Sequence, residues 1–158
     1  MTEKNKTFKK ELRLSGSGGQ GLITAGIILA KAAVLDELNV TQTQSYGPES
    51  RGGASRADVI ISNSEFYYPE ATNFDVLMCL TQEACDKYVV SLNAEGILIA
   101  DSTHIKNIPL LEAKVFEFPF TDHAIDKLGT SLPTNIMSLA FLVRHLFLFG
   151  RSRWDPSR

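Results

Sequence analysis

Apolar and polar residues repeat with two different periods along this chain. Leu12 and Leu14 alternate with polar neighbours, which is typical of a half-buried β-strand. Residues 22–38 instead place apolar side chains at helical spacing on two sides, which predicts a helix buried on both of them. Stretches that are β-branched, aromatic or continuously apolar predict further strands at residues 39–44, 57–62, 74–80, 96–102 and 113–120.

The order of these elements predicts the fold class. Thr81 is a suitable N-cap for one helix, and Gly129 is a suitable end for another. We expect a short hairpin at residues 64–69, and Pro119 places the last strand near a sheet edge. Further helices are predicted at residues 81–92, 121–129 and 133–150. Strands that alternate with helices predict an α/β fold, a single domain over residues 1–158 with a largely parallel, Rossmann-like sheet flanked by helices.

The composition is that of an ordinary globular protein. The 158 residues are 44% hydrophobic and 22% charged, which suits one buried core and argues against disorder. A formal net charge of -2 argues against a nucleic-acid partner held by bulk basic charge. The N-terminus lacks an apolar signal stretch, and Arg144 and His145 interrupt the longest apolar run. We therefore expect a cytoplasmic protein with no membrane partner.

Residues 16–21, GSGGQG, fit the G-x-G-x-x-G pattern between the first predicted strand and helix. In dinucleotide-binding proteins such glycines admit a pyrophosphate, and an acidic residue about 20 positions later holds the ribose. Here Asp36 and Glu37 come too early and Glu49 too late, which disfavours NAD. Two interpretations remain. The glycines only allow close packing, or their exposed N–H groups bind another anion, such as the phosphates of a thioester cofactor or a substrate carboxylate.

A second glycine segment, SYGPESRGGASR, follows at residues 45–56. Gly47 before Pro48 favours a turn, and the next two glycines supply backbone torsions that other residues resist. Arginine suits the recognition of carboxylate or phosphate. Alternatively, Arg51 pairs with Glu49 or with a neighbouring chain. The glycines indicate close approach by a ligand or by a protein, and the residues alone leave both open.

Together the two segments resemble the gamma subunits of 2-oxoacid:ferredoxin oxidoreductases. The similar stretches are GSGGQG with ITAGIILAKAA, QTQSYGPESRGGASRADVIIS, DVLMCLTQEACDKY and GILIADS, within about residues 12–142. Gamma subunits of 2-oxoglutarate enzymes are the most similar within this family. The resemblance implies a subunit, inactive alone, of an enzyme that oxidatively decarboxylates a 2-oxoacid with coenzyme A to the acyl-CoA. The electrons pass to ferredoxin.

The resemblance also implies cofactors and partners. We expect the complex to use thiamine diphosphate, Mg²⁺, iron–sulfur clusters and coenzyme A, none held by this chain alone, with the clusters in other subunits. Cys79 and Cys85 are too few for the usual four-thiolate cluster, and His104, His123 and His145 lack metal-ligand spacing. The expected partners are alpha and beta subunits, with a ferredoxin-like delta subunit as a further candidate, and ferredoxin.

By resemblance, the two glycine segments are expected to form a surface that contacts coenzyme A or other subunits. No catalytic and no metal-binding residue is expected in this chain. The candidate residues are Gly16, Gly18, Gly19, Gln20, Gly21, Tyr46, Gly47, Pro48, Glu49, Arg51, Gly52, Gly53 and Arg56.

The C-terminal end departs from the family pattern. Residues 144–158 stop where family members continue, which indicates either a truncation or a shifted reading frame. The alternative functions are a stand-alone nucleotide- or coenzyme-A-binding module, and a gamma-type subunit that acts on pyruvate, branched-chain 2-oxoacids or indolepyruvate.

Overall fold

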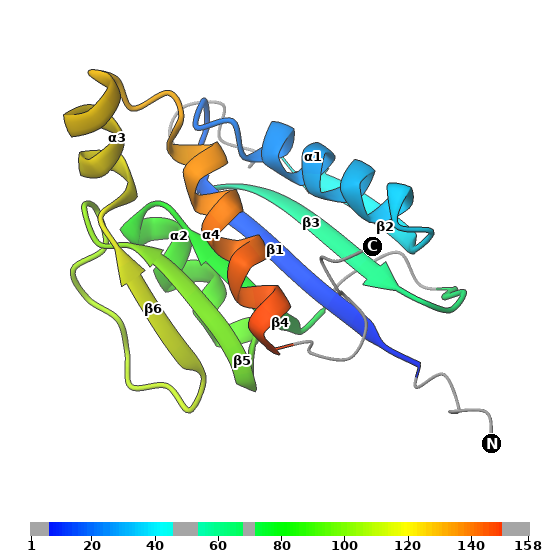
Figure 1. Cartoon of the computed structure of the whole chain (residues 1–158). Helices are drawn as coiled ribbons and strands as arrows, with labels where there is room; N and C mark the ends of the chain where they lie inside the picture. Colours follow the sequence, from blue (N-terminus) through cyan, green and yellow to red (C-terminus); the bar gives the residue numbers. More distant parts are fainter. Residues whose placement is uncertain (1–6, 46–53, 68–71, 150–158) are drawn as a thin grey trace.

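The protein is described by a computed structural model over residues 7–45, 54–67 and 72–149 (Figure 1). Its strands form one six-stranded sheet in the order β2-β3-β1-β4-β5-β6. The strands are β1 (Lys9–Ser17), β2 (Asn39–Ser45), β3 (Ala54–Ser62), β4 (Phe74–Cys79), β5 (Leu92–Asp101) and β6 (Lys114–Phe118). The helices are α1 (Leu22–Leu35), α2 (Gln82–Tyr88), the 3₁₀ turn η1 (Val89–Ser91), α3 (Phe120–Leu128) and α4 (Thr134–Phe149).

All strands of the sheet except β3 run in the same direction. The pairs β1–β4, β4–β5 and β5–β6 are parallel, whereas β3 is antiparallel to both β1 and β2. The cause is the short connection between β2 and β3, residues 46–53, because a parallel crossover needs roughly a dozen residues or more. The predicted α/β domain with a largely parallel sheet is confirmed, and β3 lies between the two strands of the β1–α1–β2 crossover.

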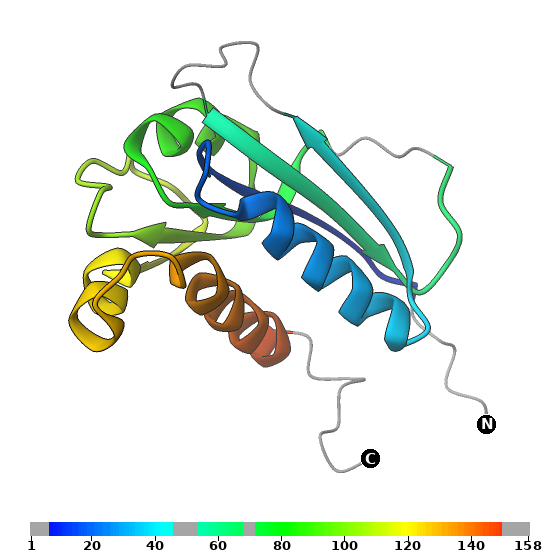
Figure 2. The same cartoon turned by 90° about the horizontal axis from the view of Figure 1, so that it is seen from above.

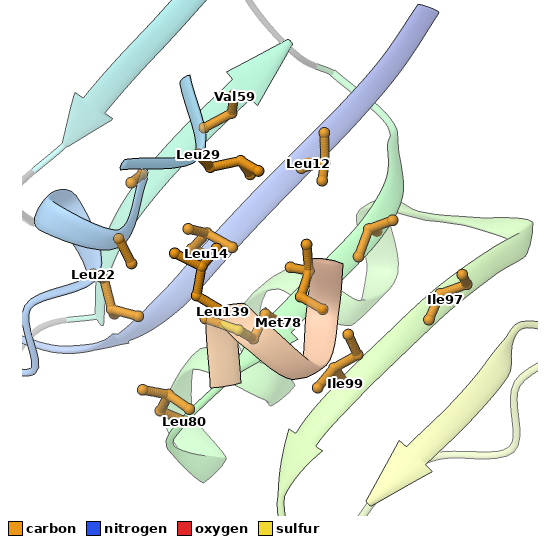
Figure 3. Close-up of a cluster of buried hydrophobic side chains, with 14 of the residues drawn as sticks. Leu12, Leu14, Leu22, Leu29, Val59, Met78, Leu80, Ile97, Ile99 and Leu139 are labelled. Atoms are coloured by element: carbon orange, nitrogen blue, oxygen red, sulfur yellow. The ribbon is translucent and has the colours of Figure 1, made fainter. Parts of the chain in front are cut away.

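Helices cover both faces of the sheet (Figure 2). On one face, α1 and α4 pack over a cluster that includes Leu14, Met78 and Leu139, which point toward one another in Figure 3. On the other face, α2 and η1 pack over a second cluster that includes Leu77 and Tyr88. Neighbouring residues of β4 thus serve opposite clusters, as the two-residue period of a strand requires.

One buried ion pair interrupts the apolar packing of β1 and β3. Arg13 Nε and Nη2 donate to the two carboxylate oxygens of Asp58, both at 2.7 Å, and the residues are only 5% and 6% exposed. The Arg13 guanidinium also lies 4.0 Å from the ring centre of Phe74 and 4.6 Å from that of Tyr88. The two charge-assisted hydrogen bonds to Asp58 and the contacts with the two aromatic rings compensate for the hydration that the guanidinium loses on burial.

The predicted helix at residues 22–38 ends earlier than its apolar pattern. Helix α1 ends at Leu35, and Glu37 takes a left-handed backbone with φ 60°. The N–H groups of Glu37 and Leu38 donate to the carbonyls of Val34 and Ala33, which is a Schellman motif. Helix ends of this kind usually carry glycine, and no glycine marked this one in the sequence.

The predicted ends of other helices and strands agree more closely with the structure. Thr81 Oγ1 accepts a bond from the Ala84 N–H and caps α2, and Gly129 ends α3 with φ 70°. Strand β6 is a sheet edge, as Pro119 predicted. Of the hairpin predicted at residues 64–69, residues 64–67 form no strand, and residues 68 and 69 lie outside the described part.

Aromatic rings join α4 to strand β6. His145 stacks on Phe141 with ring centres 4.1 Å apart, and it also meets Phe116 at 4.3 Å. Phe118 stacks on Phe141 as well, at 6.0 Å. Phe141 and His145 of α4 therefore pack on the aromatic side chains of β6. In the described ranges, no helix combines the length and apolar character needed to cross a membrane.

Candidate functional site

The first glycine turn connects β1 to α1, and two of its glycines are required by close packing. A Cβ on Gly16 would contact the Gln20 side chain, and it would lie 3.0 Å from Leu22 Cδ1 and 3.2 Å from Leu80 Cβ. A Cβ on Gly21 would contact the side-chain amide of Asn135, and the backbone there has φ 71°. The packing interpretation of the motif is therefore correct for these two positions.

Gly18 and Gly19 have different surroundings. A Cβ at either position would meet no atom within 4 Å, and both residues are exposed. The Gln20 side chain folds back onto the turn, where its Oε1 accepts a 2.7 Å bond from the Ser17 N–H. The side chain of Gln20 thus holds the turn in shape, while the main chain at Gly18 and Gly19 stays open to a close-lying ligand or protein.

The turn presents the amino end of a 14-residue helix. Gly21 is the N-cap, it supplies no side-chain hydrogen bond, and the first turn of α1 has no acidic residue. The first N–H groups of a helix lack intrahelical partners and lie at the positive end of its dipole. Such groups suit an anion, so the second interpretation of the motif stays open for this part of the turn.

A side chain distant in sequence supports the same helix start. Asn135 Nδ2 donates a 3.0 Å bond to the Gly21 carbonyl, and Asn135 Oδ1 accepts from the Ile136 N–H. The adjacent Thr134 is buried, and its Oγ1 has no hydrogen-bond partner among the described residues. Neither residue was among the candidate site residues, but Asn135, near the start of a helix predicted from the sequence, is a residue type that caps a helix or contacts a neighbour. The signal in the sequence was a polar Thr-Asn pair at the start of an apolar helix.

The sheet register brings the end of the second glycine segment next to the first. Ala54 pairs with Ser17, and Ser55 pairs with Gly16, so the chain that leaves Gly53 enters the sheet beside the GSGGQG turn. Candidate residues Tyr46, Gly47, Pro48, Glu49, Arg51, Gly52 and Gly53 lie outside the described residues. The structure thus places the end of the second glycine segment, at Ala54 and Ser55, beside the start of the first, at Gly16 and Ser17.

Arg56 has a partner within the sheet. Its Nε lies 3.9 Å from Asp58 Oδ2, and Asp58 is already held by Arg13. All three residues extend from the face of the sheet opposite to α1, because they share that side of β1 and β3. Arg56 is therefore a second cation beside a carboxylate that Arg13 already binds, on the face of the sheet opposite to α1.

The turn lies where the chain connections of the sheet diverge. From β1, the chain crosses through α1 toward β2, while from β4 it crosses through α2 toward β5 on the other side. Leu80, which follows β4, donates its N–H to the Ser15 carbonyl at 2.9 Å. Open α/β sheets bind ligands at such switch points, outside the carboxyl ends of the strands.

The cysteines and histidines do not add to this site. Cys79 and Cys85 are buried in the cluster under α2. Burial raises the pKa of the Cys79 thiol well above its ordinary value, and the hydrogen bond with Cys79 lowers the pKa of Cys85. Over the described ranges, no three His, Cys, Asp or Glu side chains are grouped to hold a metal ion.

Comparison with known proteins gives one family for this fold and motif. Residues 11–156 match the family described as pyruvate ferredoxin/flavodoxin oxidoreductase. The chain belongs to this family. It is 40% identical over 147 residues to the 2-oxoglutarate synthase subunit KorC of Methanocaldococcus jannaschii, with 91% of this chain and 79% of the relative covered.

Further relatives agree in sequence and in structure. The KorC subunit of Archaeoglobus fulgidus is 42% identical over 137 residues, which cover 87% of this chain and 71% of that one. Among solved structures, the keto/oxoacid ferredoxin oxidoreductase gamma subunit of Geobacter sulfurreducens is 42% identical with a TM-score of 0.75, and the match covers 85% of this chain and 75% of that one. The family expected from the two glycine segments is confirmed.

Proposed function

We propose that this chain is the gamma-type subunit of a 2-oxoacid:ferredoxin oxidoreductase that acts on 2-oxoglutarate. The observation that carries the proposal is the similarity to 2-oxoglutarate synthase subunits along most of the chain. In the complete enzyme, 2-oxoglutarate loses carbon dioxide, its acyl group forms a thioester with coenzyme A, and two electrons pass to ferredoxin. This chain contributes to assembly and to the walls of the site, and it has no activity alone.

The residues of this chain fit one of the expected cofactors better than the others. The two buried cysteines cannot bind a four-thiolate cluster, so we place iron–sulfur clusters, thiamine diphosphate and Mg²⁺ in other subunits. Coenzyme A carries phosphates, and the amino end of α1 beside open Gly18 and Gly19 suits a phosphate. Its thiol accepts the acyl group when it is bound.

In this proposal the two glycine segments bind and position coenzyme A. The main-chain N–H groups at the start of α1 hold an anionic group of coenzyme A, while Gln20 and Asn135 keep the turn in the shape that presents them. Arg51, Gly52 and Gly53 are proposed for the same surface, because β3 enters the sheet directly beside the turn. No residue of this chain is assigned a proton transfer.

Copurification and kinetics test the assignment. We expect a tagged chain in its native source to retain alpha and beta subunits, with thiamine-dependent reduction of ferredoxin by 2-oxoglutarate. Pyruvate, branched-chain 2-oxoacids and indolepyruvate should be poorer substrates of the same fractions. A chain that elutes alone, with no such activity in any associated fraction, would show that the proposed function is wrong.

The role of the turn needs a separate variant. In the assembled enzyme, Gly18→Ala adds a methyl group where the ligand would approach, so the KM for coenzyme A should rise about tenfold with assembly intact. Ala140→Ser, an exposed change on α4, serves as the control and should leave this KM unchanged. If Gly18→Ala leaves both assembly and the KM unchanged, the turn does not hold the cofactor.

A further inference from the structure

The amino ends of α1 and α4 meet at one point of the molecule. Gly21 is the N-cap of α1, Asn135 is the second residue of α4, and the Asn135 Nδ2 donates to the Gly21 carbonyl at 3.0 Å. The two helices start beside each other in both views (Figures 1 and 2). A Cβ on Gly21 would contact the same amide, so the glycine lets the two starts approach this closely.

The meeting of these two helix starts is electrostatically unfavourable by itself. A helix dipole places about half an elementary positive charge at each amino end, so two adjacent amino ends repel each other. An acidic residue in the first turn normally offsets this charge, and neither α1 nor α4 has one there. An anion bound at the meeting point would be attracted by both helices at once.

Thr134 gives an independent indication of a ligand. It is only 5% exposed, and its Oγ1 has no hydrogen-bond partner among the described residues. It directly precedes Asn135, so it belongs to the turn of α4 that contacts Gly21. The main-chain N–H of Thr134 already donates to the Ser131 carbonyl. A buried hydroxyl without a partner costs about 1–3 kcal/mol, and a bound anion would supply the acceptor that it lacks.

The donors narrow the choice of anion. The main-chain N–H groups come from the start of α1 and the hydroxyl from the start of α4, so they approach a ligand from two elements. A phosphomonoester has three terminal oxygens and a charge of about −1.5 to −2 at pH 7. A carboxylate, or one phosphate of a diphosphate chain, has fewer terminal oxygens and a smaller charge. Coenzyme A carries a phosphomonoester on the 3′ position of its ribose as well as a diphosphate.

We propose that the starts of α1 and α4 together bind the 3′-phosphate of coenzyme A, with the Thr134 hydroxyl as a donor to one of its oxygens. This proposal rests on the proposed function, since it takes coenzyme A as the ligand of the glycine turn. Asn135 is a positioning residue that holds the two helix starts together. The proposal adds the start of α4 to a site that the glycine motif confines to α1.

The test compares coenzyme A with 3′-dephospho-coenzyme A in the enzyme assembled from all its subunits. For the wild type, the KM for the dephosphorylated compound should be at least about tenfold higher. Thr134→Val keeps the shape of the side chain but removes the hydroxyl, so the KM for coenzyme A should rise about tenfold. The KM for 3′-dephospho-coenzyme A and the kcat should stay unchanged. Thr134→Ser retains the hydroxyl and should restore the lower KM.

Two controls separate binding from folding. Because the Thr134 hydroxyl has no partner among the described residues, Thr134→Val should not lower the urea midpoint of the isolated chain. Thr41→Val makes the same exchange on β2, at the edge of the sheet, and should leave the KM for both compounds unchanged.

The outcomes are distinct. If Thr134→Val leaves the KM for coenzyme A unchanged in an active complex, the site at the two helix starts is wrong while the proposed function stands. If Thr134→Val raises the KM for both compounds equally, the hydroxyl acts on another part of the cofactor, and the assignment to the 3′-phosphate is overturned. A wild-type chain that binds no other subunits and supports no activity with 2-oxoglutarate contradicts the proposed function itself.

Discussion

At the scale of the residue, the glycines of the first turn divide into two kinds. Gly21 has φ 71° and contacts the Asn135 amide, whereas Gly18 has no neighbour that a methyl group would meet. We predict that Gly21→Ala lowers the free energy of unfolding by about 1–3 kcal/mol, because it adds left-handed strain and a steric clash. Gly18→Ala should stay within about 0.5 kcal/mol of the wild type. Urea denaturation of both variants checks this, and equal stabilities would contradict it.

The buried ion pair gives a second prediction at this scale. Arg13→Met leaves the Asp58 carboxylate buried with Arg56 at 3.9 Å as its remaining partner, so we expect a loss of about 3–5 kcal/mol in unfolding free energy. The double variant Arg13→Met with Asp58→Leu removes both charges and should recover most of that loss. Denaturant titration of the two proteins measures the difference. A double variant as unstable as the single one would show that rings and packing, rather than charge, dominate.

The sequence predicted only part of the candidate site. The GSGGQG pattern identified the turn because a strand, glycines and a helix follow one another locally. Asn135 could not be paired with Gly21 from the sequence, since 114 residues separate them and only the packing of α4 brings them together. Arg56 was proposed for a ligand surface, and the structure adds that Asp58, two residues later, points to the same side of β3 with a carboxylate oxygen 3.9 Å from the Arg56 Nε.

At the scale of the element, the end of α1 is built with an unfavourable residue. Glu37 holds the left-handed position of the Schellman motif, and it adds a negative charge at the negative end of the helix dipole. We predict that Glu37→Gly raises the free energy of unfolding by about 0.5–1 kcal/mol, because glycine takes this conformation without strain. Glu37→Ala removes the charge alone and should give a smaller change. Thermal or urea unfolding distinguishes the two, and a destabilised glycine variant would refute the account.

Several strands followed from the sequence. The continuously apolar runs of β4 and β5 predict buried strands, and the β-branched residues of β2 predict a strand as well. The reversed direction of β3 was not predicted, although the length of residues 46–53 contains that information. The end of α1 was missed for a different reason, because a glutamate there gives no local signal for a helix stop.

At the scale of the whole molecule, the carboxyl ends of β1 and β4 place the turn at the surface, where other chains can complete it. We predict that the isolated chain binds coenzyme A more weakly than about 1 mM, because one helix end and an open turn offer few contacts. Isothermal titration measures this. Micromolar affinity without other subunits would favour the stand-alone binding module instead.

The hydrogen bond between Asn135 and the Gly21 carbonyl can form only late during synthesis of the chain. The turn leaves the ribosome 114 residues before the side chain that supports it. A nascent chain can form β1 and α1 early, since their contacts with β2 and β3 are near in sequence. The helix start that would hold an anion acquires its supporting amide only after α4 begins to emerge. The growing chain therefore completes the turn only after α4 is available to it.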